Sequence, residues 1–150
     1  MFHLPSLLIP FMILLPNLLF IKWPPRNAPA EQPKGNRLLT AFEGIGRVGS
    51  FGIPIFYAIH TDRFYEIAAW IGMALFLAFY YVEWLRYFSG NQEYRLLFSS
   101  LLAIPVPMAV FPVLYFMCAS AVLHSLPLFI CNALFAIGHI LNSLRSVEIS

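Results

Sequence analysis

Charged side chains are scarce in this sequence. Asp, Glu, Lys and Arg make up 11% of its 150 residues, whereas about a quarter of the residues in a soluble domain are usually charged. So few charges cannot cover a folded core with a polar surface, and the composition therefore excludes an ordinary soluble domain. The net charge of +2 is also too small and too scattered for a nucleic-acid-binding protein, so we expect no nucleic-acid partner.

Cysteine is almost as rare. Cys118 and Cys131 lie in unrelated apolar surroundings and give neither a disulfide framework nor a zinc site. We expect no disulfide between them, because they fall within hydrocarbon-spanning segments. No Cys-x-x-Cys, Gly-x-Ser-x-Gly or His-Glu-x-x-His motif occurs. We therefore expect no metal and no cofactor, and the sequence offers no recognisable catalytic residue.

Apolar residues, by contrast, are abundant. They make up 60% of the chain, and the mean hydropathy is +0.76, which is typical of an integral membrane protein. A spanning helix needs about 20 apolar residues. Pro127 is expected to open the last helix, because proline fits the first helical turn. The apolar runs predict an all-α bundle of five transmembrane helices in one domain, at residues 4–21, 38–59, 64–85, 97–119 and 126–144.

Basic residues are divided unevenly between the two ends of these spans. One side holds only Arg63, and the other holds Lys22, Arg26, Lys34, Arg37, Arg86, Arg95 and Arg145. The positive-inside rule makes the richer side cytoplasmic. Five spans then place the N-terminus outside and the C-terminus in the cytoplasm, with a polar, Pro-rich cytoplasmic loop at residues 22–37. We expect the first span to be a retained helix and not a signal peptide, because no Lys or Arg precedes Lys22.

Glu43 and Arg47 are the two charges within the second predicted span. At four-residue spacing, with Glu first, they can form an ion pair on one helix face. In an upright helix they would lie about 7 and 13 Å from the inner surface. Two interpretations remain open. The pair lines a pocket that opens to the cytoplasm, or it is a neutralised pair that only holds the helix in place.

Other polar side chains are expected in the same cytoplasmic half of the bundle. Asn132, His139 and Asn142 share one face of the fifth span, because they are seven and three residues apart. Each could instead be a core polar residue with a satisfied partner. The residues predicted to form a ligand site are Arg47, Glu43, His139, Asn17, Tyr80 and Asn132.

Four glycines also lie on the second span. Small residues three or four positions apart let another helix approach closely. Packing within the bundle is the simpler interpretation, and a homodimer through this helix is the alternative. The four residues are Gly44, Gly46, Gly49 and Gly52.

Short motifs in this chain resemble those of a group of small bacterial membrane proteins with five predicted transmembrane helices. The motifs are Leu15-Pro16-Asn17, Glu43-Gly44-Ile45-Gly46-Arg47, Tyr80-Tyr81 with Trp84, and Gly138-His139-Ile140. The resemblance implies a multi-pass protein of the inner (cytoplasmic) membrane and carries over no activity. In topology alone, the chain is also similar to tryptophan-rich sensory, translocator-type five-helix proteins.

Three functional hypotheses follow. The first is binding or translocation of a small anionic or amphipathic molecule in a cytoplasm-facing pocket. Here Arg47 would meet the anionic group, Glu43 and His139 would tune the charge, and Tyr80 or Asn17 would orient the ligand. The second is a membrane-embedded enzyme acting on a lipid or isoprenoid, with Glu43 or His139 as general acid or base. The third is a non-catalytic accessory subunit of a membrane complex.

Overall fold

The fold is all-helical, as the sequence predicts. The computed structural model describes residues 2–30 and 35–148, and within them it contains five α-helices and no β-strand. Residues 31–34 of the predicted 22–37 loop lie outside the described residues. The α-helices are α1 (Leu8–Lys22), α2 (Arg37–Gly52), α3 (Phe64–Ser89), α4 (Pro107–Val122) and α5 (Leu126–Val147). Three short 3-10 helices connect or extend them: η1 (Leu4–Leu7), η2 (Ile53–Phe56) and η3 (Tyr94–Leu97).

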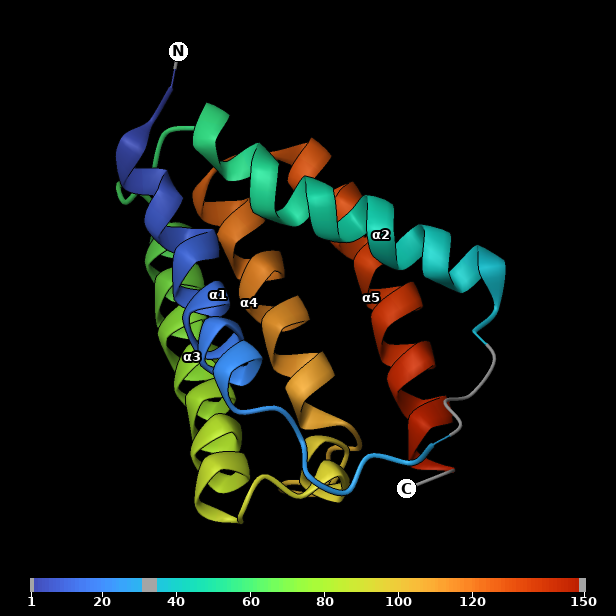
Figure 1. Cartoon of the computed structure of the whole chain (residues 1–150). Helices are drawn as coiled ribbons and strands as arrows, with labels where there is room; N and C mark the ends of the chain where they lie inside the picture. Colours follow the sequence, from blue (N-terminus) through green and yellow to red (C-terminus); the bar gives the residue numbers. More distant parts are fainter. Residues whose placement is uncertain (1, 31–34, 149–150) are drawn as a thin grey trace.

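Three helical segments are long and apolar enough to cross a membrane: Leu4–Lys22, Phe64–Ser89 and Leu126–Val147. They match the first, third and fifth predicted spans and support a membrane location. Pro127 lies in the first turn of α5, as predicted, and the side chain of Ser125 caps this helix. Helices α1, α3 and α5 run in one direction and α4 runs in the other (Figure 1).

The fourth helix begins at Pro107, whereas the apolar run predicted a start at residue 97. Two prolines explain the late start. Each proline lacks an N–H and disfavours helical geometry in the residue before it, and Val106, between Pro105 and Pro107, adopts a left-handed conformation with φ 45°. The preceding residues instead form η3 and a turn closed between Leu101 and Ile104. Helix α4 is apolar but shorter than the three candidate spans.

The second helix also differs from its predicted span. It ends at Gly52 and not at residue 59, and η2 continues the chain to Phe56. Pro54 cannot donate a backbone hydrogen bond, so the α-helical pattern does not extend through it. Figure 1 shows α2 running obliquely to α4 and α5. The depths of Glu43 and Arg47 worked out for an upright helix therefore do not apply.

Helices α2 and α5 pack with their backbones almost in contact. A Cβ atom added to Gly46 would overlap the backbone of Phe135 and lie 2.6 Å from the carbonyl oxygen of Cys131. A Cβ atom added to Gly138 would lie 2.5 Å from the carbonyl oxygen of Leu39. Only glycine permits so close an approach at these positions. We call these two helices the α2–α5 pair.

The glycines of α2 divide between two faces of the helix. Gly46 and Gly49 both pack against Cys131 of α5 within the same chain. A Cβ atom at Gly44 or Gly52 would meet nothing within 4 Å. The packing interpretation thus accounts for two of the four glycines, and a second copy of the chain would have only the other two to pack against.

Helices α1, α3 and α4 form a second group, in which α3 packs against α4 and tyrosine hydroxyls bond α1 to both. The hydroxyl of Tyr81 on α3 donates to the carbonyl oxygen of Met12 on α1, at 2.8 Å. That of Tyr115 on α4 donates to the carbonyl oxygen of Ile9, at 3.0 Å. We call this the α1–α3–α4 group. The short turn between α4 and α5 joins it to the α2–α5 pair, and α4 also packs directly against α5.

Candidate functional site

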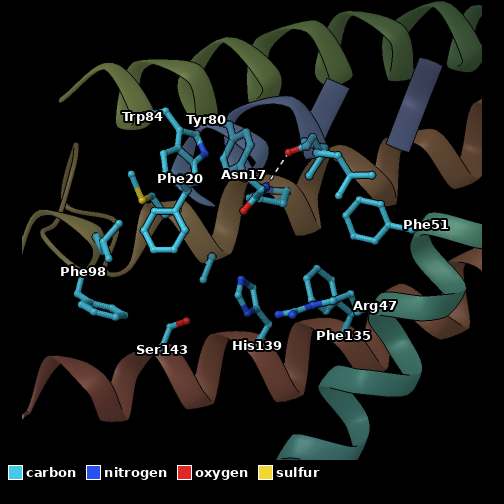
Figure 2. A pocket seen from close by; sticks show the side chains of 16 residues that line it. Asn17, Phe20, Arg47, Phe51, Tyr80, Trp84, Phe98, Phe135, His139 and Ser143 are labelled. Atoms are coloured by element: carbon cyan, nitrogen blue, oxygen red, sulfur yellow. Dashed lines mark hydrogen bonds between the residues drawn. The ribbon is translucent and has the colours of Figure 1, made fainter. Parts of the chain in front are cut away.

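A cavity of about 370 Å³ lies between the α2–α5 pair and the α1–α3–α4 group. Residues from all five α-helices line it, together with Leu97 and Phe98 from the segment before α4. Its wall is mostly apolar and aromatic, with a few polar groups pointing inward (Figure 2). This composition is usual for a small-molecule pocket. The polar residues in the lining are Asn17, Arg47, Tyr80, His139 and Ser143.

Glu43 is the centre of the polar network on one side of this cavity. Its Oε1 accepts from a guanidinium nitrogen of Arg47 at 2.5 Å and lies 2.9 Å from Nδ1 of His139. Its Oε2 accepts from the side-chain amide of Asn142 at 2.8 Å. One carboxylate of α2 therefore fixes two side chains of α5 as well as the arginine one turn further along its own helix.

Arg47 and His139 present their remaining polar atoms to the cavity. Among the described residues, the guanidinium of Arg47 makes no hydrogen bond except the one to Glu43, and its side chain is 53% exposed. The ring of His139 stacks on Phe135 with centroids 4.8 Å apart, and Nε2 has no partner in the described part of the chain. Figure 2 shows the two side chains next to one another on the cavity wall.

Asn17 and Tyr80 lie across the cavity from Arg47 (Figure 2). The amide of Asn17 donates to the Tyr80 hydroxyl at 2.9 Å and to the carbonyl oxygen of Ile13 at 2.8 Å. Its side-chain oxygen makes no hydrogen bond to any described residue. The ring of Tyr80 is buried against Trp84. This wall therefore offers a hydrogen-bond acceptor, and the Tyr80 hydroxyl proton, to a bound molecule.

The structure brings most of the predicted residues together. Arg47, His139, Asn17 and Tyr80 line the same cavity, and Glu43 is hydrogen-bonded to two of them from behind. Asn132 lies elsewhere.

The side chain of Asn132 is fully buried between α4 and α5, where its amide donates to the carbonyl oxygen of Val113 at 2.9 Å. It does not line the cavity, and its contact is that of a helix-packing residue. Sequence reasoning missed Ser143 as a cavity residue. Its position one turn after His139 is a signal that could have identified it.

A separate polar cluster lies where α3 begins and α4 ends. Glu66 is buried and accepts from the backbone N–H groups of Asp62 and Arg63, at 2.6 and 2.9 Å. Its other oxygen lies 2.7 Å from Nε2 of His124. The ring of His60 stacks on that of His124 with centroids 4.2 Å apart. These contacts hold the first turn of α3 against the turn between α4 and α5.

Neither cluster resembles a metal site. Within residues 2–30 and 35–148, no three His, Cys, Asp or Glu side chains converge as a metal ion would require, and Cys118 and Cys131 are both free thiols. No protein-family model, no curated protein and no solved structure matches this chain. The chemistry of the cavity is therefore the guide to function.

Proposed function

We propose that this chain is a multi-pass protein of the bacterial inner membrane that binds or translocates a small molecule with an anionic group, and that the cavity holds this molecule. The observation that carries the proposal is the position of Arg47. Its guanidinium is anchored by Glu43 and still has free N–H groups beside the cavity. Arginine binds carboxylate and phosphate oxygens through paired N–H groups, so it is well suited to an anionic ligand.

The surrounding groups support the same assignment. Glu43 is the less exposed member of its ion pair, at 19% against 53% for Arg47, and it accepts hydrogen bonds from α5. The Glu43 carboxylate thus faces α5, and the Arg47 guanidinium faces the cavity. Across the cavity, Asn17 and Tyr80 can accept from or donate to uncharged polar atoms of the ligand.

The proposed orientation places the N-terminus outside and the C-terminus in the cytoplasm. The end of α1, the segment between α3 and α4, and the end of α5 lie at the same end of the molecule (Figure 1). These segments, together with the loop after α1 and the last turn of α3, carry Lys22, Arg26, Arg86, Arg95 and Arg145, and such an excess is what the positive-inside rule requires of a cytoplasmic side. The cavity then lies nearer the cytoplasmic end, since Leu97 and Phe98 contribute to its wall.

A second candidate function is a membrane-embedded enzyme, and one contact favours it. Glu43 lies 2.9 Å from Nδ1 of His139, so a carboxylate orients an imidazole whose other nitrogen faces the cavity. This is the arrangement by which a histidine is held as a general base. Ser143 lines the same cavity one turn away. A lipid ester would be a fitting substrate class for such a group in a membrane.

Native mass spectrometry of the purified protein in a mild detergent tests the proposal. We expect a discrete bound mass in the wild-type protein that is lost in Arg47→Gln while the variant stays folded and monodisperse. Arg47→Lys is the matched control, because it keeps the charge and removes the paired N–H geometry; it should bind more weakly than wild type and more strongly than Arg47→Gln.

Other outcomes distinguish the alternatives. If Arg47→Gln retains the bound mass at wild-type occupancy, Arg47 does not hold the ligand and the proposal is wrong. A stoichiometric protein partner in place of a small mass would favour an accessory subunit. An enzyme would convert an added candidate substrate to a product of different mass, whereas a binding protein would release it unchanged.

A further inference from the structure

A second cavity lies next to the first, and all the side chains that line it are apolar. It measures about 290 Å³ and lies between η1, the start of α1 and the end of α2. Leu14 of α1 and Phe51 of α2 line both cavities, so the two spaces meet at these side chains. The other residues of the second cavity, which we call the α1 groove, are Leu4, Leu7, Leu8, Pro10 and Phe11.

The α1 groove lies where α1 and α2 are not joined. Among the described residues no hydrogen bond connects α1 to α2, whereas α1 is bonded to both α3 and α4. The nearest links lie beyond the groove, where η1 meets the η2 segment through Ser6 and Tyr57, at 2.6 Å, and through His3 and Ile55, at 2.8 Å. The side chains of Leu14 and Phe51 therefore lie between the α1 groove and the cavity that Arg47 lines.

The surface around the α1 groove is apolar. Leu4, Leu8 and Phe11 are among the most exposed apolar side chains of the N-terminal segment, and this segment is one of the three candidate membrane spans. In a bilayer such side chains contact lipid chains. A water-soluble anion would lose its hydration in the α1 groove without gaining a polar partner. An alkyl chain, in contrast, would contact only apolar side chains there.

We propose that the ligand is a single-chain amphiphile with a carboxylate head, such as a long-chain fatty acid, taken from the membrane through the gap between α1 and α2. The inference rests on the proposed function, because it uses the same Arg47 pocket for the head. The carboxylate pairs with the free N–H groups of Arg47, and the alkyl chain passes between Leu14 and Phe51 into the α1 groove. We place one chain in this arrangement, because the α1 groove shares Leu14 and Phe51 with the pocket.

The charge of the pocket favours a carboxylate over a phosphate monoester. Glu43 accepts one hydrogen bond from Arg47, and among the described residues Arg47 is the one Lys or Arg side chain that lines the polar cavity. A head group with one negative charge can pair with the N–H groups of Arg47 that Glu43 leaves free. A second negative charge would be repelled by the Glu43 carboxylate, which lies beside Arg47. An alkyl phosphate of the same chain length therefore serves as the comparison ligand.

Photo-crosslinking in nanodiscs of phosphatidylcholine tests the placement of both ends of the ligand. The probe is palmitate with a diazirine near the end of its chain. We expect crosslinks to concentrate in residues 4–14 and at Phe51, to fall at least fivefold in Arg47→Gln, and to be displaced by unlabelled palmitate more effectively than by the matching alkyl phosphate.

Two further variants separate the groove from general lipid contact. Leu8→Trp places a bulky ring in the α1 groove, and Leu18→Trp is its matched control, because Leu8 and Leu18 are 61% and 54% exposed on the same helix and Leu18 lines neither cavity. We expect Leu8→Trp to reduce crosslinking and Leu18→Trp to leave it unchanged. Both positions are exposed, so neither variant should prevent folding.

The outcomes separate the inference from the proposed function. Crosslinks spread evenly over the exposed apolar surface, and unaffected by Arg47→Gln and Leu8→Trp, would show general lipid contact and overturn the inference. If native spectra still show an Arg47-dependent small anion, the pocket stands and only the amphiphile is wrong. If neither an adduct nor Arg47-dependent crosslinking is found, both proposals fail. Stronger displacement by the alkyl phosphate would overturn the choice of a carboxylate head.

Discussion

Replacing single glycines of α2 by alanine tests the packing between α2 and α5. Gly46→Ala adds a methyl group that overlaps the backbone of Phe135 and lies 2.6 Å from the Cys131 carbonyl oxygen. Backbone atoms cannot move aside as a flexible side chain can. Carbon atoms normally come no closer than about 3.5 Å, so the two helices must separate by about 1 Å at this point.

The cost of this separation can be worked from the contacts it disturbs. Overpacking of a close interface costs about 1–3 kcal/mol. The same shift stretches the bonds from Glu43 to His139 and Asn142, now 2.9 and 2.8 Å, and a hydrogen bond to a charged group contributes about 1.5–3 kcal/mol. Alanine is favoured over glycine in a helix by about 1 kcal/mol. The expected net loss is therefore about 2–4 kcal/mol.

Thermal unfolding in a mild detergent, followed by tryptophan fluorescence, measures the effect. At this chain length each kcal/mol corresponds to about 2–4 °C, so Gly46→Ala should lower Tm by roughly 5–15 °C. Gly44→Ala is the matched control on the same helix, because its Cβ would meet nothing within 4 Å. It should leave Tm unchanged or raise it by a few degrees through the gain in helix propensity.

Two results would refute this reasoning. A Gly46→Ala protein as stable as wild type would mean that α2 and α5 do not pack backbone to backbone. A Gly44→Ala protein that is strongly destabilised would mean that the other face of α2 is covered, as a homodimer through this helix would require. In that case the oligomeric state of Gly44→Ala should also change.

Two further substitutions lie outside the cavity and should spare ligand binding. Glu66→Gln removes the charge that faces His124 and weakens the acceptor for two backbone N–H groups at the start of α3; we expect a stability loss of about 1–3 kcal/mol, measured by the same thermal unfolding. Asn132→Leu removes a buried amide that donates to a carbonyl oxygen of α4. We expect the free energy of unfolding to fall by about 1 kcal/mol and the bound mass in native spectra to stay unchanged. If that mass were lost, Asn132 would have to be counted as a ligand-binding residue.

Long, uninterrupted apolar runs were the most predictable part of the fold. The first, third and fifth spans agree with the structure, because each is a run of spanning length whose ends carry ordinary helix signals. Ser125 and Pro127 mark the start of α5 with a side-chain cap and a first-turn proline. For such segments the local sequence and the tertiary structure favour the same helix.

The bounds of the second and fourth helices were mispredicted because apolar composition alone does not define where a helix begins or ends. Residues 97–106 are apolar but contain Pro105 and are followed by Pro107, and the backbone there turns instead of coiling. In α2 the sequence is amphipathic and glycine-rich, and the helix is placed by its contact with α5. That contact joins residues almost a hundred positions apart, such as Glu43 and His139. The glycine spacing indicates a close helix contact but does not show that the partner is α5.

The candidate site was predictable to the extent that polar residues in apolar helices must find partners. This rule selects Glu43, Arg47 and His139 but does not show which of them faces a cavity. It also selects Asn132, which the structure places in a helix contact. Whether a polar residue lines the cavity or packs between helices depends on where the α2–α5 pair leaves a space beside the α1–α3–α4 group. Only the tertiary structure shows where that space lies.

The two interpretations of Glu43 and Arg47 are not exclusive in this arrangement. The backbone of Glu43 lies against Gly138, directly beside His139, so the closest point of the α2–α5 contact is also the point from which the polar network extends. If the pair only neutralised itself, both side chains could be buried alike. Instead Glu43 is hydrogen-bonded to His139 and Asn142 of α5 as well as to Arg47, and Arg47 keeps free N–H groups beside the cavity. The carboxylate thus bonds α2 to α5 and, through its hydrogen bond to Arg47, also positions the guanidinium beside the cavity.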